Sequence, residues 1–177
     1  MTLPFEVTVC VNAIWKVLSS DVIKHSCYYH RVVKKSNATV AYAFGTQISQ
    51  GGVDAEIQGN YSVCLFKDGE RYVIALIGVF VPKKMNGMLC QGIVCHLSSW
   101  IELTANSSSD VRSSLSRSHC RFTVELDGSN ANLLASQCLS TAKSMHEVIS
   151  SRVMSFLEKV LVEEDWKRNG RPMRIVV

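Results

Sequence analysis

The segment Cys120-Arg121-Phe122-Thr123-Val124-Glu125-Leu126 decides the fold class of this chain. Apolar and polar residues alternate along it, so Cys120, Phe122, Val124 and Leu126 share one face, and Arg121, Thr123 and Glu125 share the other. Because successive side chains of a strand point to opposite faces, this pattern predicts a half-buried strand. Asp127-Gly128 then turns the chain, and Ser129 or Asn130 is expected to cap a helix by accepting a bond from a free backbone amide.

A long helix is predicted directly after this turn. Apolar residues recur at helical spacing, and neither Gly nor Pro interrupts them before Gly170: Leu134, Cys138, Ala142 or Met145, Ile149, Val153, Phe156 and Val160. The 39 residues from Asn130 to Arg168 would form a helix roughly 58 Å long. That length exceeds the width of a compact domain of this size, so we expect the helix to break near Ser150-Ser151 or to project.

Composition bounds the class of protein. The chain has 177 residues, of which 47% are hydrophobic and 19% charged, which is enough apolar material for a real core and too much for a disordered chain. The net charge of +4 permits contact with nucleic acid without requiring it. We therefore expect a globular chain with a domain over residues 1–150 and a helical extension with a basic tail over residues 151–177.

Cysteine usage and the N-terminus indicate a reducing compartment. The seven cysteines are odd in number, and several fall on predicted buried strand faces, where free Cys behaves as a small hydrophobe. Residues 1–6 have no basic and apolar regions of the kind that form a secretory signal. No apolar run reaches the ~20 residues that span a bilayer. The predicted location is nuclear or cytosolic.

The rest of the chain reads mainly as strands. The clearest signal is the hairpin of Tyr61–Phe66 and Arg71–Ile77 around Asp68-Gly69, because Asp-Gly supplies the positive φ that tight hairpin turns need. Further strands are predicted over Phe5–Leu18, where β-branched and aromatic residues are frequent, and over Cys27–Val33, Thr39–Ile48 and Gly87–Leu97. A serine-rich loop is expected from Ala105 to Ser118.

This order of elements predicts an α+β fold: a seven-stranded antiparallel β sandwich or barrel with a long C-terminal helix. The helix would close one open end, bury its apolar face and cover sheet edges. The pleckstrin-homology-like superfold has this order. An OB-like barrel is the nearest alternative, although it has five strands.

No catalytic or metal site emerges from the motifs. Cys95-His96 and His119-Cys120 are strand neighbours, so each pair points to opposite faces and cannot act as a nucleophile–base couple. There is no Cys-x-x-Cys pair for zinc and no glycine loop of the dinucleotide or phosphate type. We predict no enzyme activity and no cofactor, and a thiol or metal enzyme is the third-ranked hypothesis.

Two candidate interaction surfaces lie near the C-terminus. The excess length of the helix favours a protein-contact surface on its outer part, formed by Val153, Phe156, Val160 and Trp166. A basic group follows and could contact nucleic-acid phosphates, through Lys167, Arg168, Arg171 and Arg174. The OB-like alternative instead predicts single-stranded nucleic-acid binding with bases stacked on Tyr28, Tyr29, Tyr42 and Tyr61.

The closing segment resembles a known family. Phe122-x-Val124, Gly128, Ala135 and Cys138 look like the last strand and helix of the pleckstrin-homology-like domain in the meiotic recombination family Rec-one-fourteen, and Ile48-Ser49-Gln50-Gly51 is similar to a strand-end motif there. The resemblance implies a nuclear, non-enzymatic scaffold that helps assemble the machinery for programmed DNA double-strand breaks. It also implies protein partners for the folded domain, with oligomerisation and DNA contact through a helical region.

Overall fold

A computed structural model describes residues 1–170 except 21–23, 25–26, 51–52, 107–112 and 128–130, and it also leaves out the side chains of 50, 53, 131–135, 137–138, 142 and 144–152. The elements, in chain order, are β1 (Thr2–Leu3), α1 (Val7–Leu18), β2 (Cys27–Lys35), β3 (Thr39–Gln50), β4 (Val53–Asp68), β5 (Arg71–Met85), β6 (Met88–Leu89), β7 (Ile93–Ala105), β8 (Ser114–Leu126) and α2 (Ala131–Asn169).

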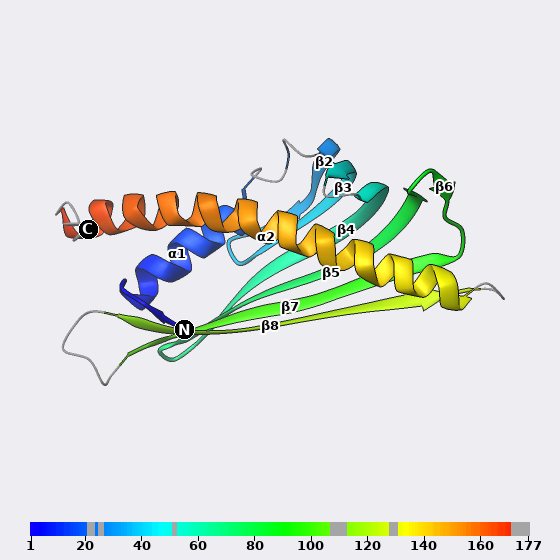
Figure 1. Cartoon of the computed structure of the whole chain (residues 1–177). Coiled ribbons are helices and arrows are strands. Elements are labelled where there is room, and N and C mark those ends of the chain that lie inside the picture. The colour runs from blue at the N-terminus through cyan, green and yellow to red at the C-terminus, as the bar shows by residue number, and fades with distance from the viewer. Residues whose placement is uncertain (21–23, 25–26, 51–52, 107–112, 128–130, 171–177) are drawn as a thin grey trace.

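The strands form one antiparallel sheet, and both helices lie on the same face of it (Figure 1). The strand order is β1-β8-β7-β5-β4-β3-β2, with the short β6 paired to β5. The predicted α+β class, with an antiparallel sheet and a long C-terminal helix, is confirmed. The predicted seven-stranded sandwich or barrel is wrong, because β1 and β2 lie at opposite ends of the eight-stranded sheet and do not pair to close it.

The first predicted strand is the helix α1. Most of its buried residues recur at the spacing of one helical face: Val9, Cys10, Ala13, Ile14 and Val17. The β-branched composition of Phe5–Leu18 favoured a strand, but intrinsic propensity is a weak preference that tertiary packing overrides. This helix fills the space between the sheet and α2, and the barrel prediction had no element for that space.

The hairpin and the closing strand are confirmed. In the β4–β5 hairpin Asp68 pairs with Arg71, and Gly69 adopts a φ of 58°. Phe122, Val124 and Leu126 pack towards the core, and Glu125 on the other face pairs with His96 at 3.2 Å. The strand also extends back to Ser114, so part of the predicted serine-rich loop is strand.

The helix α2 is continuous from Ala131 to Asn169, so it does not break at Ser150-Ser151. Nor does it project, because the sheet is long enough to support it: the 16 residues of β4 span roughly 53 Å. The boundary expected between residues 150 and 151 therefore falls inside one helix. The caps predicted at Ser129 and Asn130 lie outside the described residues.

Two apolar clusters make up the core. The larger joins α1, the C-terminal half of α2 and the middle of the sheet, and it includes Tyr42, Val63, Leu103 and Val160. The smaller lies at the other end of the same sheet face and includes Ile57, Met85 and Ile93. Only Phe80 packs against both clusters among the described residues, so the two meet along a narrow contact.

Candidate functional site

The sheet face towards the helices is incompletely covered between the two clusters. We call its solvent-accessible part on β5, β7 and β8 the inner patch, which comprises the half-buried Leu76, Leu97, Ser99, Ile101 and Phe122 and the exposed Cys120. These residues are neighbours across the strands, because Leu76 pairs with Ser99, Leu97 with Phe122, and Ser99 with Cys120. All of them keep some exposure to solvent although α2 lies along this face.

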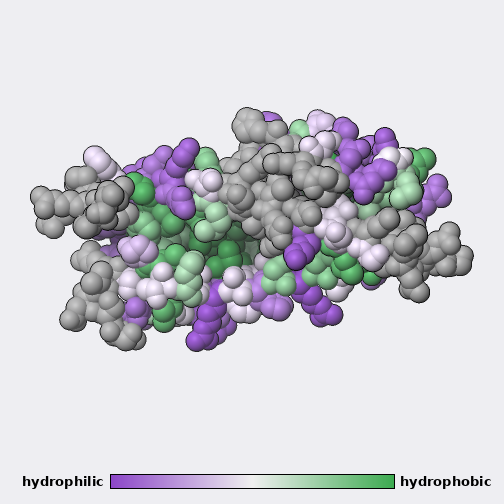
Figure 2. All heavy atoms as spheres, in the orientation of Figure 1, coloured by the Kyte–Doolittle hydropathy of each residue, from purple (hydrophilic) through white to green (hydrophobic). Residues whose placement is uncertain are grey.

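The inner patch is apolar. Its one hydroxyl belongs to Ser99 and donates a hydrogen bond to the backbone carbonyl of His119 at 3.0 Å. Its one thiol belongs to Cys120 and is exposed. None of its six members is charged. Figure 2 shows apolar side chains in the gap between the helix layer and the β8 edge. Such a surface can hold an apolar molecule by excluding water, and it offers no acid–base pair for catalysis.

Next to the inner patch lies a ladder of stacked rings. The ring of His30 stacks on that of Tyr42 at 4.5 Å between centroids, and Tyr42 stacks on Tyr61 at 5.0 Å. The Tyr42 hydroxyl donates to the carbonyl of Ser19 at 2.6 Å, and His30 Nε2 lies 2.9 Å from the Tyr61 hydroxyl. These bonds satisfy the polar ends of buried rings, so the ladder stabilises the fold.

The tyrosines predicted to stack on bases are therefore divided. Tyr42 and Tyr61 are buried in the core and cannot reach a base. Tyr28 and Tyr29 are exposed and pack edge to face at 5.4 Å. Desolvation raises the pKa of the Tyr28 hydroxyl, which bonds to Gln58 and Glu56. The OB-like barrel itself is wrong, since the sheet is a single open one.

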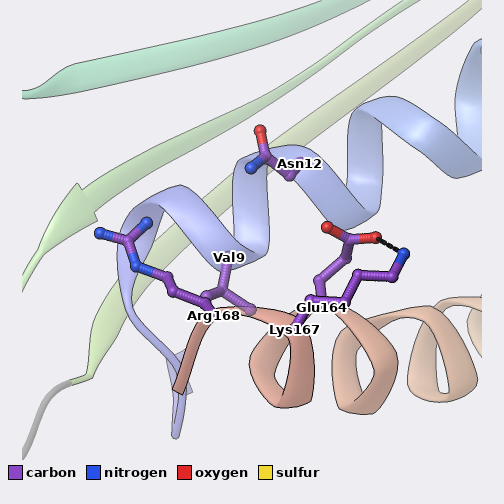
Figure 3. A pocket seen from close by; sticks show the side chains of 5 residues that line it. All are labelled: Val9, Asn12, Glu164, Lys167 and Arg168. Carbon is purple, nitrogen blue, oxygen red and sulfur yellow. Dashed lines mark hydrogen bonds and ion pairs between the residues drawn. The ribbon is translucent and has the colours of Figure 1, made fainter. Parts of the chain in front are cut away.

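A shallow pocket of about 240 Å³ lies between the ends of α1 and α2 (Figure 3). It is smaller than the 300–1,000 Å³ typical of small-molecule sites. Lys167 donates to Glu164 at 2.9 Å within α2, and Lys16 of α1 reaches the same carboxylate at 3.4 Å. The hydrogen bond from Lys167 lowers the pKa of Glu164 and raises that of Lys167. The charged side chains at this pocket therefore hold α1 and α2 together, through the ion pair of Lys16 and Glu164.

The predicted phosphate-contacting residues belong partly to this contact. Lys167 pairs with Glu164, and Arg168 pairs with Glu6 at 3.0 Å and bonds to the Thr8 hydroxyl. Their charge is therefore largely used within the chain. Arg171 and Arg174 lie outside the described residues, so the nucleic-acid prediction stays untested there.

The four predicted partner-contact residues also differ in burial. Val160 and Val153 pack in the larger cluster, whereas Phe156 and Trp166 are exposed, the latter by 57%. The helical pattern read from the sequence put Phe156 in register with the apolar face, but the residues that face the sheet are Val153, Leu157, Val160 and Leu161. The two registers differ by one residue, since Leu157 rather than Phe156 faces the sheet, and only the packing distinguishes them.

The structure gives no metal or thiol site among the described residues. Cys95 is buried on the inner face and His96 lies on the outer one, as the alternation predicts. No group of three or more His, Cys, Asp or Glu side chains is placed to hold a metal ion in the described part of the chain. Cys10 is fully buried, 3.2 Å from the Ser114 hydroxyl, and desolvation raises its pKa. None of the described helices is both long and apolar enough to cross a membrane.

Comparison with known proteins identifies the fold. No protein-family model and no curated protein matches the sequence. The structure is similar to the ZhuI aromatase/cyclase from Streptomyces sp. R1128, with a TM-score of 0.51 and 15% identity over 96% of this chain and 92% of that one. A conserved protein from Geobacillus kaustophilus aligns with a TM-score of 0.46 and 12% identity over 92% of each chain.

These findings correct the family resemblance. The likeness to ZhuI is one of fold, a helix-grip arrangement of the Bet v1-like type, in which a long C-terminal helix lies along a curved antiparallel sheet. The resemblance to Rec-one-fourteen, the pleckstrin-homology-like domain and the meiotic role drawn from it are wrong. The quoted motif joins the end of a strand to the start of a helix, a combination that many folds share. The nuclear or cytosolic location remains a prediction.

Proposed function

We propose that this chain binds an apolar small molecule on the inner patch, beneath α2. The observation that carries the proposal is the gap between the two core clusters. Among the described side chains, Leu97 packs against neither cluster, and Leu76, Ile101 and Phe122 remain half-buried. Apolar surface left accessible inside a fold is costly, at about 25 cal/mol per Å², and a bound apolar molecule recovers that free energy.

The fold likeness supports a small-molecule role. The similar protein ZhuI is an aromatase/cyclase, a name that denotes chemistry on a small organic molecule. At 15% identity the likeness carries no residue of that chemistry to this chain. The inner patch has no charged side chain, so binding without catalysis is the proposal here.

Filling the inner patch is expected to abolish this binding. Ser99 lies in its centre, between Leu76 and Cys120. We expect Ser99→Phe to weaken the binding of the neutral fluorophore N-phenyl-1-naphthylamine at least tenfold, because the ring occupies the space that the probe needs; this equals about 1.4 kcal/mol. Fluorescence titration of the full chain gives the dissociation constant, and thermal unfolding checks that the variant is folded.

The neighbouring serine supplies the control. Ser98 lies next to Ser99 but points to the opposite face of β7 and is exposed. Ser98→Phe should leave probe affinity unchanged, and the bound probe should slow alkylation of Cys120 relative to Cys64, whose side chain is on the outer face. Equal weakening by both variants, or no saturable binding to the wild type, would refute the proposal.

A second candidate is protein contact through the exposed side of α2, as the excess of exposed aromatic area there suggests. Phe156 and Trp166 project from the helix away from the core cluster, and large exposed aromatic residues are enriched at interfaces. A truncation at Ser150 cannot test this surface, because it would also remove the core residues Val160 and Leu161.

Two exposed substitutions test the protein-contact candidate without touching the core. The double variant Phe156→Ser, Trp166→Ser is expected to lower the amount of partner protein recovered from nuclease-treated native extract at least tenfold. The melting temperature should stay close to that of the wild type, because both side chains are exposed. Partners that persist with the double variant would exclude this side of α2.

A further inference from the structure

The central strand β5 is apolar on both faces. Tyr72, Ile74, Leu76 and Phe80 face the helices and pack against the larger cluster. The residues between them face outward and are also apolar: Val73, Ala75, Ile77, Val79 and Val81. An antiparallel strand with one face in water normally alternates apolar and polar residues, whereas a continuous apolar run is typical of a strand covered on both sides. The sequence of β5 therefore predicts a second cover.

The outward side of β5 lacks this cover in the single chain. Ile77 is 60% exposed, and Val79 and the neighbouring Phe66 are exposed as well. With Trp100 on the next strand, which stacks on His119 at 5.9 Å, they form the outer patch: Phe66, Val73, Ala75, Ile77, Val79, Val81 and Trp100. The two helices lie on the opposite face of the sheet, so they cannot cover the outer patch (Figure 1).

The centre of the outer patch is uncharged. Across the strands, Ile77 pairs with Ser62 and Ser98, and Ala75 pairs with Cys64 and Trp100. Beyond β4, the strand β3 presents the small Ala41 and Ala43 on this face, and Arg31 of β2 pairs with Ala43. Charged side chains surround this centre: Glu102 pairs with Val73, and Arg121 lies across from Ser98 on β8. Glu102 also contacts Arg71 at 3.9 Å, and Glu125 lies 3.2 Å from His96, which pairs with Val79. Depletion of charge at the centre with charges at the rim is the composition of a protein interface.

We propose that the outer patch is the contact between two copies of this chain, which pack sheet against sheet. Two antiparallel sheets stack about 10 Å apart with their strands within about 30° of each other. The face on β3, β4, β5 and β7 is roughly 19 Å wide and, from Val73 to Val81, roughly 30 Å long. This is roughly 570 Å² per copy, above the about 500 Å² per partner that a specific interface needs.

The charge pattern selects a second copy over other occupants. A nucleic acid or an anionic membrane would need cations within the patch, and its centre has none among the described residues. A twofold contact places the same patch on both sides, and an uncharged patch can oppose itself without like-charge repulsion. The dimer is independent of the inner patch, because the two surfaces are on opposite faces of the sheet.

Sedimentation equilibrium of the full chain tests the proposal. The wild type is expected to have twice the chain mass of 19.7 kDa. Ile77→Lys should weaken the dimer at least 100-fold, because it places two like charges in the contact. Ser98→Arg is the second variant: Ser98 is polar and exposed, so the monomer tolerates the change even if Ile77→Lys lowers stability. Thermal unfolding of each variant verifies the fold.

Val162→Lys on the opposite layer is the matched control. Val162 is exposed on α2, so the same change from an aliphatic residue to lysine should leave the dimer intact. A wild type that stays monomeric at its highest soluble concentration would overturn the proposal, even if it captured a different protein. Dissociation by Val162→Lys with none by Ser98→Arg would also overturn it and would place the contact on α2.

Discussion

Val160→Asp is expected to unfold this protein. Val160 lies on α2 with 2% of its surface exposed, inside the larger core cluster with residues of α1 and the sheet. Burial of a carboxylate without a partner is expected to cost at least about 3 kcal/mol, and the loss of apolar packing adds to that cost. Small domains are stable by only about 5–15 kcal/mol, so most or all of the stability is lost.

Val162→Asp is the matched control for this substitution. Val162 lies two residues further along α2 and is 47% exposed, so the same change should alter stability by less than about 0.5 kcal/mol. Urea unfolding followed by circular dichroism gives both free energies of unfolding. If the two variants are equally stable, α2 does not pack on the sheet through Val160, and the folded arrangement described above is incorrect.

Leu103→Ala is expected to lower the free energy of unfolding by about 3 kcal/mol. Leu103 on β7 is 0% exposed and packs in the larger cluster between the sheet and α1. Removal of its branched end leaves a cavity that neighbours on a paired strand and a helix cannot readily fill. The cost is therefore that of lost transfer free energy plus the cavity.

Leu115→Ala is the control, because it makes the same change from leucine to alanine at an exposed position. Leu115 is on the adjacent strand β8, points to the outer face and is 40% exposed. Its truncation should cost less than about 1 kcal/mol, as measured in the same urea titration. A Leu103→Ala variant as stable as Leu115→Ala would show that the space beside α1 collapses without cost.

Local pattern accounts for much of the sheet. The alternation over Cys120–Leu126 identified one strand and the Asp68-Gly69 turn identified one hairpin, because the period of a strand and the need for positive φ are local properties. The same reasoning placed α1 incorrectly. In Phe5–Leu18 a β-branched composition and a helical period compete, and the contact with α2 and β7 favours the helix.

The candidate surfaces were less accessible to sequence reasoning. The inner patch consists of ordinary apolar and small residues such as Leu97 and Ser99, and no motif distinguishes them from core. The outer patch did leave a signal: β5 is apolar on both faces from Tyr72 to Val81. The family resemblance was wrong because it rested mainly on the end of one strand and the start of one helix, which occur in many folds.

The sequence by itself determined the α+β class, the order of the strands from Cys27 onward and the single long helix at the end, because hydrophobic period and turn residues act over a few neighbours. Only the tertiary structure decided that the sheet stays open, that α1 is a helix and that Leu157 rather than Phe156 faces the core. Those features depend on which surfaces, far apart in the sequence, bury each other. The free energy of that burial cannot be determined from any short stretch of sequence.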